Sequence, residues 1–168
     1  MTVTQPAATT SGFHAFTAAL AARDVDALAA TLAPDAVLHS AVTDVPFEGR
    51  ELLHDLYTSL FATFEELRVT DEFANEDTLV FFWEGRMDGR FIEGADRVRL
   101  NSQGQVQDIT IVGRPLYGLS AFITKLGNDL ARRRRGGLVA GLLKVMTFPL
   151  PYLFRSFDPL TRWLIRTR

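Results

Sequence analysis

The chain has 168 residues, is 47% hydrophobic and contains no cysteine. This length and apolar content predict one globular domain with its own core. The absence of cysteine excludes disulfides, thiolate nucleophiles and cysteine metal sites, and it suits a cytoplasmic protein. Residues 1–11 have neither a basic start nor an apolar run, so we expect a disordered lead and not a signal peptide.

The formal net charge of −2 conceals two regions of opposite sign. Residues 1–129 hold 9 Lys and Arg against 19 Asp and Glu, whereas residues 130–168 hold 9 against 1. An acidic body and a basic end require separate explanations.

The N-terminal part of the chain reads as helices. Apolar residues at helical spacing predict a first helix over residues 13–22. Asp24 has the side chain of an N-cap for a second helix, which Pro34 is expected to end. A short strand is expected over residues 35–39, and a wide apolar stripe predicts a third helix over residues 50–64.

A run of β-branched and aromatic residues follows. Four strands are expected, over residues 67–73, 79–87, 91–100 and 106–112. The dipeptide Asp88-Gly89 is a strong hairpin signal between the second and third. Helices first and an antiparallel meander afterwards predict an α+β domain, with helices packed on one face of a curved sheet.

Three segments in this order resemble a known superfamily: DVDALAATLAPDAVLHS, PFEGRELLHDLY and GADRVRLNSQGQVQDITIVGRPL. The order resembles the nuclear transport factor 2-like superfamily, and most closely its SnoaL-like bacterial members, over about residues 12–125, and the domain is expected to span residues 12–130. The resemblance implies a cone-shaped fold that encloses a deep, mostly apolar cavity, and homodimers formed through the outer sheet face. Relatives include ketosteroid isomerases, polyketide cyclases, limonene-epoxide hydrolases and non-catalytic binders, so the fold alone leaves function open.

The resemblance to ketosteroid isomerases gives Asp96 a specific position. That chemistry needs a carboxylate base and two acidic donors for the developing enolate oxygen. Asp96 falls at the donor aspartate, Phe16 at the tyrosine donor and Ser40 at the base. Two of the three groups therefore lack the required chemistry, and steroid isomerisation by that mechanism is not expected.

Asp96 remains the leading candidate for a catalytic group, and His39 is the second. A carboxyl in an apolar cavity either has a raised pKa or forms an ion pair, here with an arginine that closes the cavity. Strand alternation turns only one of His39 and Ser40 inward, and the resemblance favours Ser40 as the ligand contact. His39 is then a polar residue at the cavity rim or a general base, with Asp44 as a possible orienting group.

The expected ligand-binding wall is aromatic. Phe81, Trp83 and Met87 share one strand face, and Tyr57 and Phe61 lie on the helix opposite. Such a wall suits a small, flat, apolar ligand, while the tyrosine hydroxyl and the indole provide polar contacts.

No cofactor or metal is expected. The three histidines lie on different elements without close-spaced ligand partners, and no glycine-rich phosphate loop is present. Two functions stay open. One is a cofactor-free acid/base enzyme of the isomerase, cyclase or hydrolase type, with Asp96 as acid or base and His39 or Ser40 as second group. The other is a non-catalytic protein that binds a lipid-like ligand and docks to a membrane or a partner through its basic tail.

The C-terminal extension, residues 131–168, needs its own interpretation. A further amphipathic helix is expected over residues 119–130, and four arginines follow it. Residues 138–154 are apolar but contain one lysine and two prolines, so this run is expected to be too short and too broken for a spanning helix of ~20 residues. Asp158 followed by proline is a typical helix start.

Basic and apolar residues mixed with tryptophan are typical of a membrane-surface segment, here residues 132–168. The alternative is a segment that packs on the domain or on a partner subunit. A nucleic-acid partner is less favoured, because neither interleaved stacking aromatics nor a nucleic-acid-binding motif is present.

Overall fold

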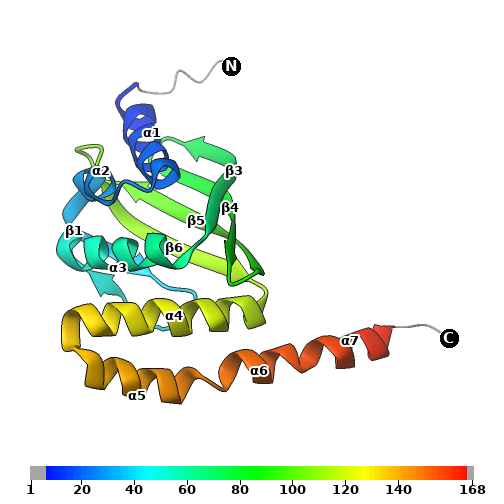
Figure 1. The fold of residues 1–168 in the computed structure, drawn as a ribbon. Coiled ribbons are helices and arrows are strands. Elements are labelled where there is room, and N and C mark those ends of the chain that lie inside the picture. Colours follow the sequence, from blue (N-terminus) through cyan, green and yellow to red (C-terminus); the bar gives the residue numbers. More distant parts are fainter. Residues whose placement is uncertain (1–6, 166–168) are drawn as a thin grey trace. The chain divides into compact units, whose positions relative to one another are not determined.

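The computed structural model describes residues 7–165 (Figure 1). The chain divides into two units, residues 1–113 and residues 114–168, called here the N-terminal and C-terminal units. The sequence placed this boundary at residue 130, which would cut through a continuous helix. The expectation of a disordered lead is wrong for residues 7–11, which belong to the first helix, and residues 1–6 lie outside the described part.

Three helices belong to the N-terminal unit: α1 (Ala7–Ala22), α2 (Val25–Thr31) and α3 (Arg50–Thr63). Asp24 caps α2 as predicted, and its Oδ1 accepts a hydrogen bond from the Ala27 amide at 2.9 Å. Pro34 does not end α2. The helix ends where the backbone becomes extended at Leu32, and Pro34 lies within the strand that starts there.

Six strands form one sheet in the order β2-β1-β6-β5-β4-β3: β1 (Leu32–His39), β2 (Phe47–Glu48), β3 (Glu66–Asn75), β4 (Thr78–Met87), β5 (Arg90–Leu100) and β6 (Val106–Arg114). The order confirms the predicted meander from β3 to β6. Asp88 and Gly89 connect β4 and β5 with φ values of 49° and 69°, as a tight hairpin turn of this hand requires. β1 pairs with β6 in parallel, so the sheet is mixed.

One face of the sheet carries the core. On β4, Phe81 and Trp83 are buried while Phe82 between them is exposed, which is the alternation of a strand covered on one side. Figure 1 shows α3 across that side of the sheet. Asp96 is buried on the same face of β5. The structure therefore confirms an α+β fold in which α3 packs against the face that bears Trp83 and Asp96.

The C-terminal unit consists of helices: α4 (Leu116–Arg135), α5 (Gly137–Thr147), α6 (Leu150–Arg155) and α7 (Phe157–Ile165). The chain turns at Gly136, where φ is 86°, and α5 packs against α4. Asn128 of α4 donates a hydrogen bond to the Ala140 carbonyl of α5 at 3.1 Å. α7 begins one residue before the predicted Asp158 start.

We predict that Asp24→Ala lowers the free energy of unfolding by about 1 kcal/mol, because α2 then loses its only side-chain N-cap contact. Asp24→Asn keeps a capping oxygen and should stay close to the wild type. Urea denaturation of the three proteins measures the difference. Equal stability of the alanine variant and the wild type would contradict a capping role.

Candidate functional site

The Asp96 carboxyl lies inside the N-terminal unit. Its residue is 7% exposed and stands opposite Phe81 in the β4–β5 register. Oδ1 accepts a hydrogen bond of 2.8 Å from the Trp83 indole N–H. The carboxyl therefore points into the core and has a neutral donor as its partner.

Burial sets the protonation of this group. Loss of hydration, opposed in part by the hydrogen bond from Trp83, raises the pKa of Asp96 from 3.8 to about 7. The prediction of a pKa raised by desolvation is confirmed. The alternative of an arginine ion pair is not supported, since the described contact is to an indole. The carboxyl therefore holds its proton to a higher pH than an ordinary aspartate does.

Tyr57 brings a second polar group to the same interior. Its residue is 2% exposed, and within the described residues its hydroxyl is buried without a hydrogen-bond partner. Burial raises the pKa of Tyr57 well above 10, and the negative charge of ionised Asp96 raises it further. The hydroxyl therefore remains a neutral donor whether or not Asp96 is ionised.

Aromatic rings surround these two groups. Phe16 meets Tyr57 edge-on at 6.5 Å between ring centroids and lies 6.2 Å from Phe81, while Phe64 meets Trp83 at 5.9 Å. The predicted wall residues are all buried: Tyr57, Phe61, Phe81, Trp83 and Met87. Their role as ligand contacts remains a prediction.

Two glycines on the inner face leave room for the rings. A Cβ at Gly94 would lie 2.5 Å from the Trp83 indole and 2.4 Å from the Val112 carbonyl oxygen. A Cβ at Gly85 would lie 2.4 Å from the Phe64 ring. The sequence marked these glycines only as strand and turn positions. Their place opposite large aromatic residues on a buried face was the available signal.

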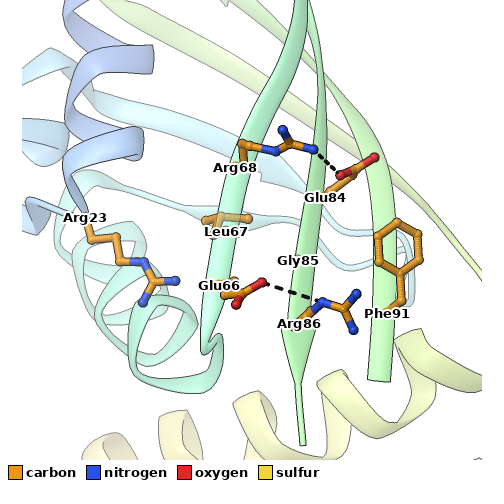
Figure 2. Close-up of a pocket in the computed structure, with 8 residues that line it drawn as sticks. All are labelled: Arg23, Glu66, Leu67, Arg68, Glu84, Gly85, Arg86 and Phe91. Carbon is orange, nitrogen blue, oxygen red and sulfur yellow. Dashed lines mark hydrogen bonds and ion pairs between the residues drawn. The ribbon is translucent and has the colours of Figure 1, made fainter. Parts of the chain in front are cut away.

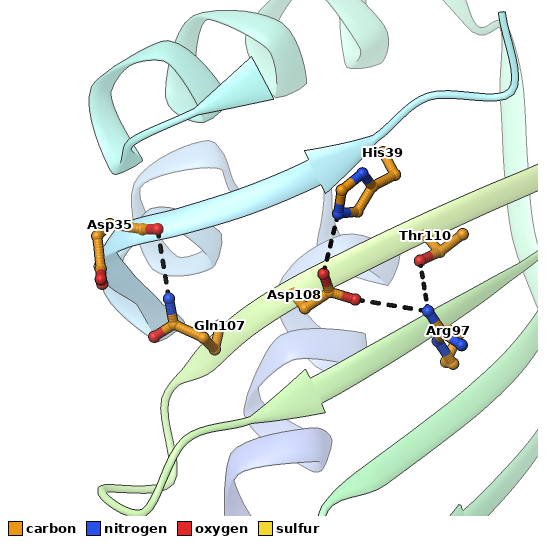
Figure 3. A network of polar contacts seen from close by, with 6 residues as sticks. All are labelled: Asp35, His39, Arg97, Gln107, Asp108 and Thr110. Carbon is orange, nitrogen blue, oxygen red and sulfur yellow. Dashed lines mark hydrogen bonds and ion pairs between the residues drawn. The ribbon is translucent and has the colours of Figure 1, made fainter. Parts of the chain in front are cut away.

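His39 does not join the site. Its imidazole is 47% exposed, and its Nε2 lies 3.1 Å from Asp108 Oδ2 (Figure 3). Asp108 also lies 3.8 Å from Arg97, which donates a hydrogen bond to Thr110. Arg97 follows Asp96 on the same strand, so this network is on the opposite face of the sheet. His39 is thus a polar residue with a partner, as one expectation had it, but its partner is Asp108 on the outer face, and the alternative of a general base is not supported.

Asp44 is placed differently from the expectation, whereas the role of Ser40 as a ligand contact stays a prediction. The Ser40 hydroxyl accepts a hydrogen bond from the Val42 amide at 3.2 Å, which is a local turn contact. Asp44 is exposed, and Asp108 rather than Asp44 contacts His39. The polar group that accompanies Asp96 is thus Tyr57.

A separate pocket of about 500 Å³ opens near β3, β4 and the start of β5 (Figure 2). Cross-strand ion pairs line it: Arg68 and Glu84 lie 2.7 Å apart, and Arg86 and Glu66 lie 3.5 Å apart. The opposite charges of each pair neutralise each other. Because these side chains are exposed to solvent, each ion pair contributes little to the stability of the folded protein. Because Glu84 adjoins Trp83 on β4, its side chain leaves the sheet on the face away from Asp96. This pocket is not the candidate site.

No metal-ligand set accompanies the site. Within residues 7–165, no three His, Asp or Glu side chains gather closely enough to hold a metal ion. The chemistry that this interior can offer is proton exchange by Asp96 and hydrogen-bond donation by Tyr57.

The family follows from a comparison of sequences. The model of a family described as SnoaL-like domain matches residues 13–109, more than half of the chain. The chain belongs to the SnoaL-like domain family. No curated protein matches its sequence significantly.

Solved structures confirm the nuclear transport factor 2-like fold of this SnoaL-like protein. A steroid delta-isomerase from Pseudomonas aeruginosa is similar with a TM-score of 0.68 and 25% identity, over 79% of this chain and 95% of that chain. An uncharacterised protein with a cystatin-like fold from Silicibacter pomeroyi is similar with a TM-score of 0.61 and 20% identity, over 73% of this chain and 86% of that chain. A putative ketosteroid isomerase from Kribbella flavida is similar with a TM-score of 0.55 and 18% identity, over 64% of this chain and 78% of that chain.

The raised pKa of Asp96 predicts a stability that depends on pH. Between pH 3.8 and about 7 the unfolded chain has released this proton and the folded protein still holds it, so folding stability falls as pH rises. The contribution of the protonated Asp96 carboxyl to the free energy of unfolding is full below pH 3.8 and is lost above about pH 7. It amounts to on the order of 4 kcal/mol. Asp96→Asn should remove it, and urea denaturation of both proteins from pH 4 to 8 tests this. Parallel stability curves would contradict the assignment.

Gly94→Ala should displace the Trp83 indole. We expect overpacking to lower the free energy of unfolding by roughly 1–3 kcal/mol. Loss of the indole bond should also raise the pKa of Asp96 further, since that bond lowers it. Carboxyl NMR titration measures the pKa, and Gly141→Ala, which has open space around it, is the control. An unchanged pKa would show that the indole bond survives.

Proposed function

We propose that the N-terminal unit binds a small apolar molecule that carries a carbonyl or hydroxyl oxygen, with Tyr57 and Asp96 as its polar contacts. The observation that carries this proposal is the buried Tyr57 hydroxyl without a partner, in electrostatic contact with Asp96. The aromatic surroundings favour an apolar ligand body.

An unsatisfied buried hydroxyl destabilises the protein by roughly 1–3 kcal/mol. An acceptor oxygen on a ligand would remove that penalty by taking the Tyr57 proton into a hydrogen bond. Protonated Asp96 is a second donor, because its O–H can bond to the same oxygen while its other oxygen keeps the Trp83 contact. Two donors that converge on one oxygen would select ketones and alcohols over plain hydrocarbons.

Acid/base catalysis is a second candidate function, and the pKa of Asp96 favours it. A carboxyl with a pKa of about 7 exchanges protons readily near neutrality, whereas Tyr57 stays protonated. Ionised Asp96 would remove a proton from the carbon next to a ligand carbonyl, Tyr57 would stabilise the enolate oxygen, and Asp96 would return the proton to another carbon. The similarity to a steroid delta-isomerase supports a reaction of this type.

A β,γ-unsaturated 3-ketosteroid tests both functions. Trp83 fluorescence in a Trp163→Phe protein, which leaves Trp83 as the single tryptophan, reports binding. Absorbance of the conjugated enone reports turnover. We expect Tyr57→Phe to weaken binding about 2–10-fold through loss of one hydrogen bond. Asp96→Asn keeps donor capacity but cannot exchange a proton, so it should bind and not turn over.

Tyr152→Phe, a change at an exposed tyrosine of α6, is the matched control and should bind as the wild type does. Equal affinity of Tyr57→Phe and the wild type for the steroid would show that the Tyr57 hydroxyl does not contact the ligand. Turnover that survives in Asp96→Asn would remove Asp96 as proton carrier. Binding by the wild type without turnover would leave the binding function alone.

A further inference from the structure

The helix α5 is apolar on two faces, and only one of them is covered. Ala140 is 1% exposed on the side that packs against α4. The other side carries large apolar side chains at high exposure: Leu138 92%, Leu142 64%, Val145 73% and Met146 66%. A helix that is apolar all round belongs in a core or in contact with lipid. No residue of α6 or α7 is buried either, although both are rich in apolar residues.

The apolar segment is longer than the sequence suggested. Gly137–Ile165 spans 29 residues, contains a stretch of mean hydropathy 1.5, and has the length and composition to cross a membrane. Of that stretch, 6% is buried within the protein. This revises the expectation that the segment is too short to cross a membrane.

The packing of α5 argues for a position along the membrane surface and against crossing. Besides the Asn128–Ala140 bond, Thr124 of α4 donates to the Thr147 carbonyl of α5 at 3.5 Å. If α5 crossed the bilayer, α4 would enter with it and carry Asp129 into the hydrocarbon. Burying such charges in lipid is unfavourable. An interfacial position leaves α4 in water and the outer face of α5 in contact with lipid.

The charge of the C-terminal unit identifies the kind of surface. This unit holds 11 Lys and Arg against 2 Asp and Glu, whereas the N-terminal unit holds 7 against 18. Arg132–Arg135 are exposed in the last turn of α4, directly before α5 in the chain. On α7, Trp163 is 72% exposed beside Arg162, a combination suited to the lipid headgroup region. An anionic surface would attract this unit and repel the other.

We propose that α5, α6 and α7 dock on the surface of an anionic lipid bilayer, with the apolar side chains at the acyl boundary and the arginines on the phosphates. This site lies outside the SnoaL-like match, which ends at residue 109. The docking surface therefore adds to the ligand-binding unit and does not depend on its proposed function.

Vesicle co-sedimentation of the full chain tests the proposal. We use phosphatidylcholine vesicles with and without 30% phosphatidylglycerol. The wild type should bind the anionic vesicles and release them as salt rises. Arg132→Gln/Arg135→Gln should weaken binding about 30-fold at low salt. Leu142→Asp should weaken it at least tenfold. The controls Arg99→Gln and Phe73→Asp change exposed residues of the sheet and should bind as the wild type does.

Other outcomes overturn the proposal. Failure of the wild type to bind anionic vesicles, with normal circular dichroism, removes it. If light scattering then shows that the wild type self-associates and Leu142→Asp does not, the apolar face is an interface between copies. Equal binding to neutral and anionic vesicles removes the arginine role.

Fluorescence quenching separates surface docking from crossing. Lipids brominated near the headgroup should quench the wild type more than lipids brominated near the chain ends, and the difference should vanish in Trp163→Phe. Stronger quenching by the deep bromines would mean that α7 enters the hydrocarbon, and the surface position would be wrong.

Discussion

The confinement of the Asp96 carboxyl among aromatic side chains dominates the chemistry of the N-terminal unit. An ionised carboxylate in such surroundings is poorly stabilised, and a single indole N–H from Trp83 does not replace the lost hydration. The group therefore holds its proton to near neutrality. Its charge, when present, acts on the Tyr57 hydroxyl. Two titratable groups with well-separated pKa values thus share one apolar interior, an arrangement found at functional sites as well as in structural networks.

The two units of the chain meet opposite physical requirements. The N-terminal unit turns its aromatic side chains inward and carries ion pairs such as Arg68–Glu84 outside. The C-terminal unit exposes apolar side chains and carries most of the basic residues. The proposed lipid-docking surface would serve the proposed ligand site, because a bilayer concentrates apolar molecules near any protein bound to it.

Local patterns in the sequence determined the elements of the N-terminal unit. Alternation along β4 and β5 identified which side chains enter the core, including Asp96, because strand geometry sends successive residues to opposite faces. Asp88-Gly89 fixed the hairpin, since only a few residue types accept positive φ at both turn positions. Even the direction of the Asp96 pKa followed from placing a carboxyl on an apolar strand face.

Relations between distant elements were decided only by the tertiary structure. The hydroxyl of Tyr57 reaches the surroundings of Asp96 because of how α3 packs on the sheet, which no local pattern encodes. The partner of His39 could not be predicted from the sequence, since its contact with Asp108 depends on the parallel pairing of β1 with β6. The same holds for Gly94, whose missing side chain matters because the Trp83 indole and the Val112 carbonyl oxygen pack against it. Sequence periodicity determines which face a side chain occupies within one element, whereas long-range packing determines which side chains meet there.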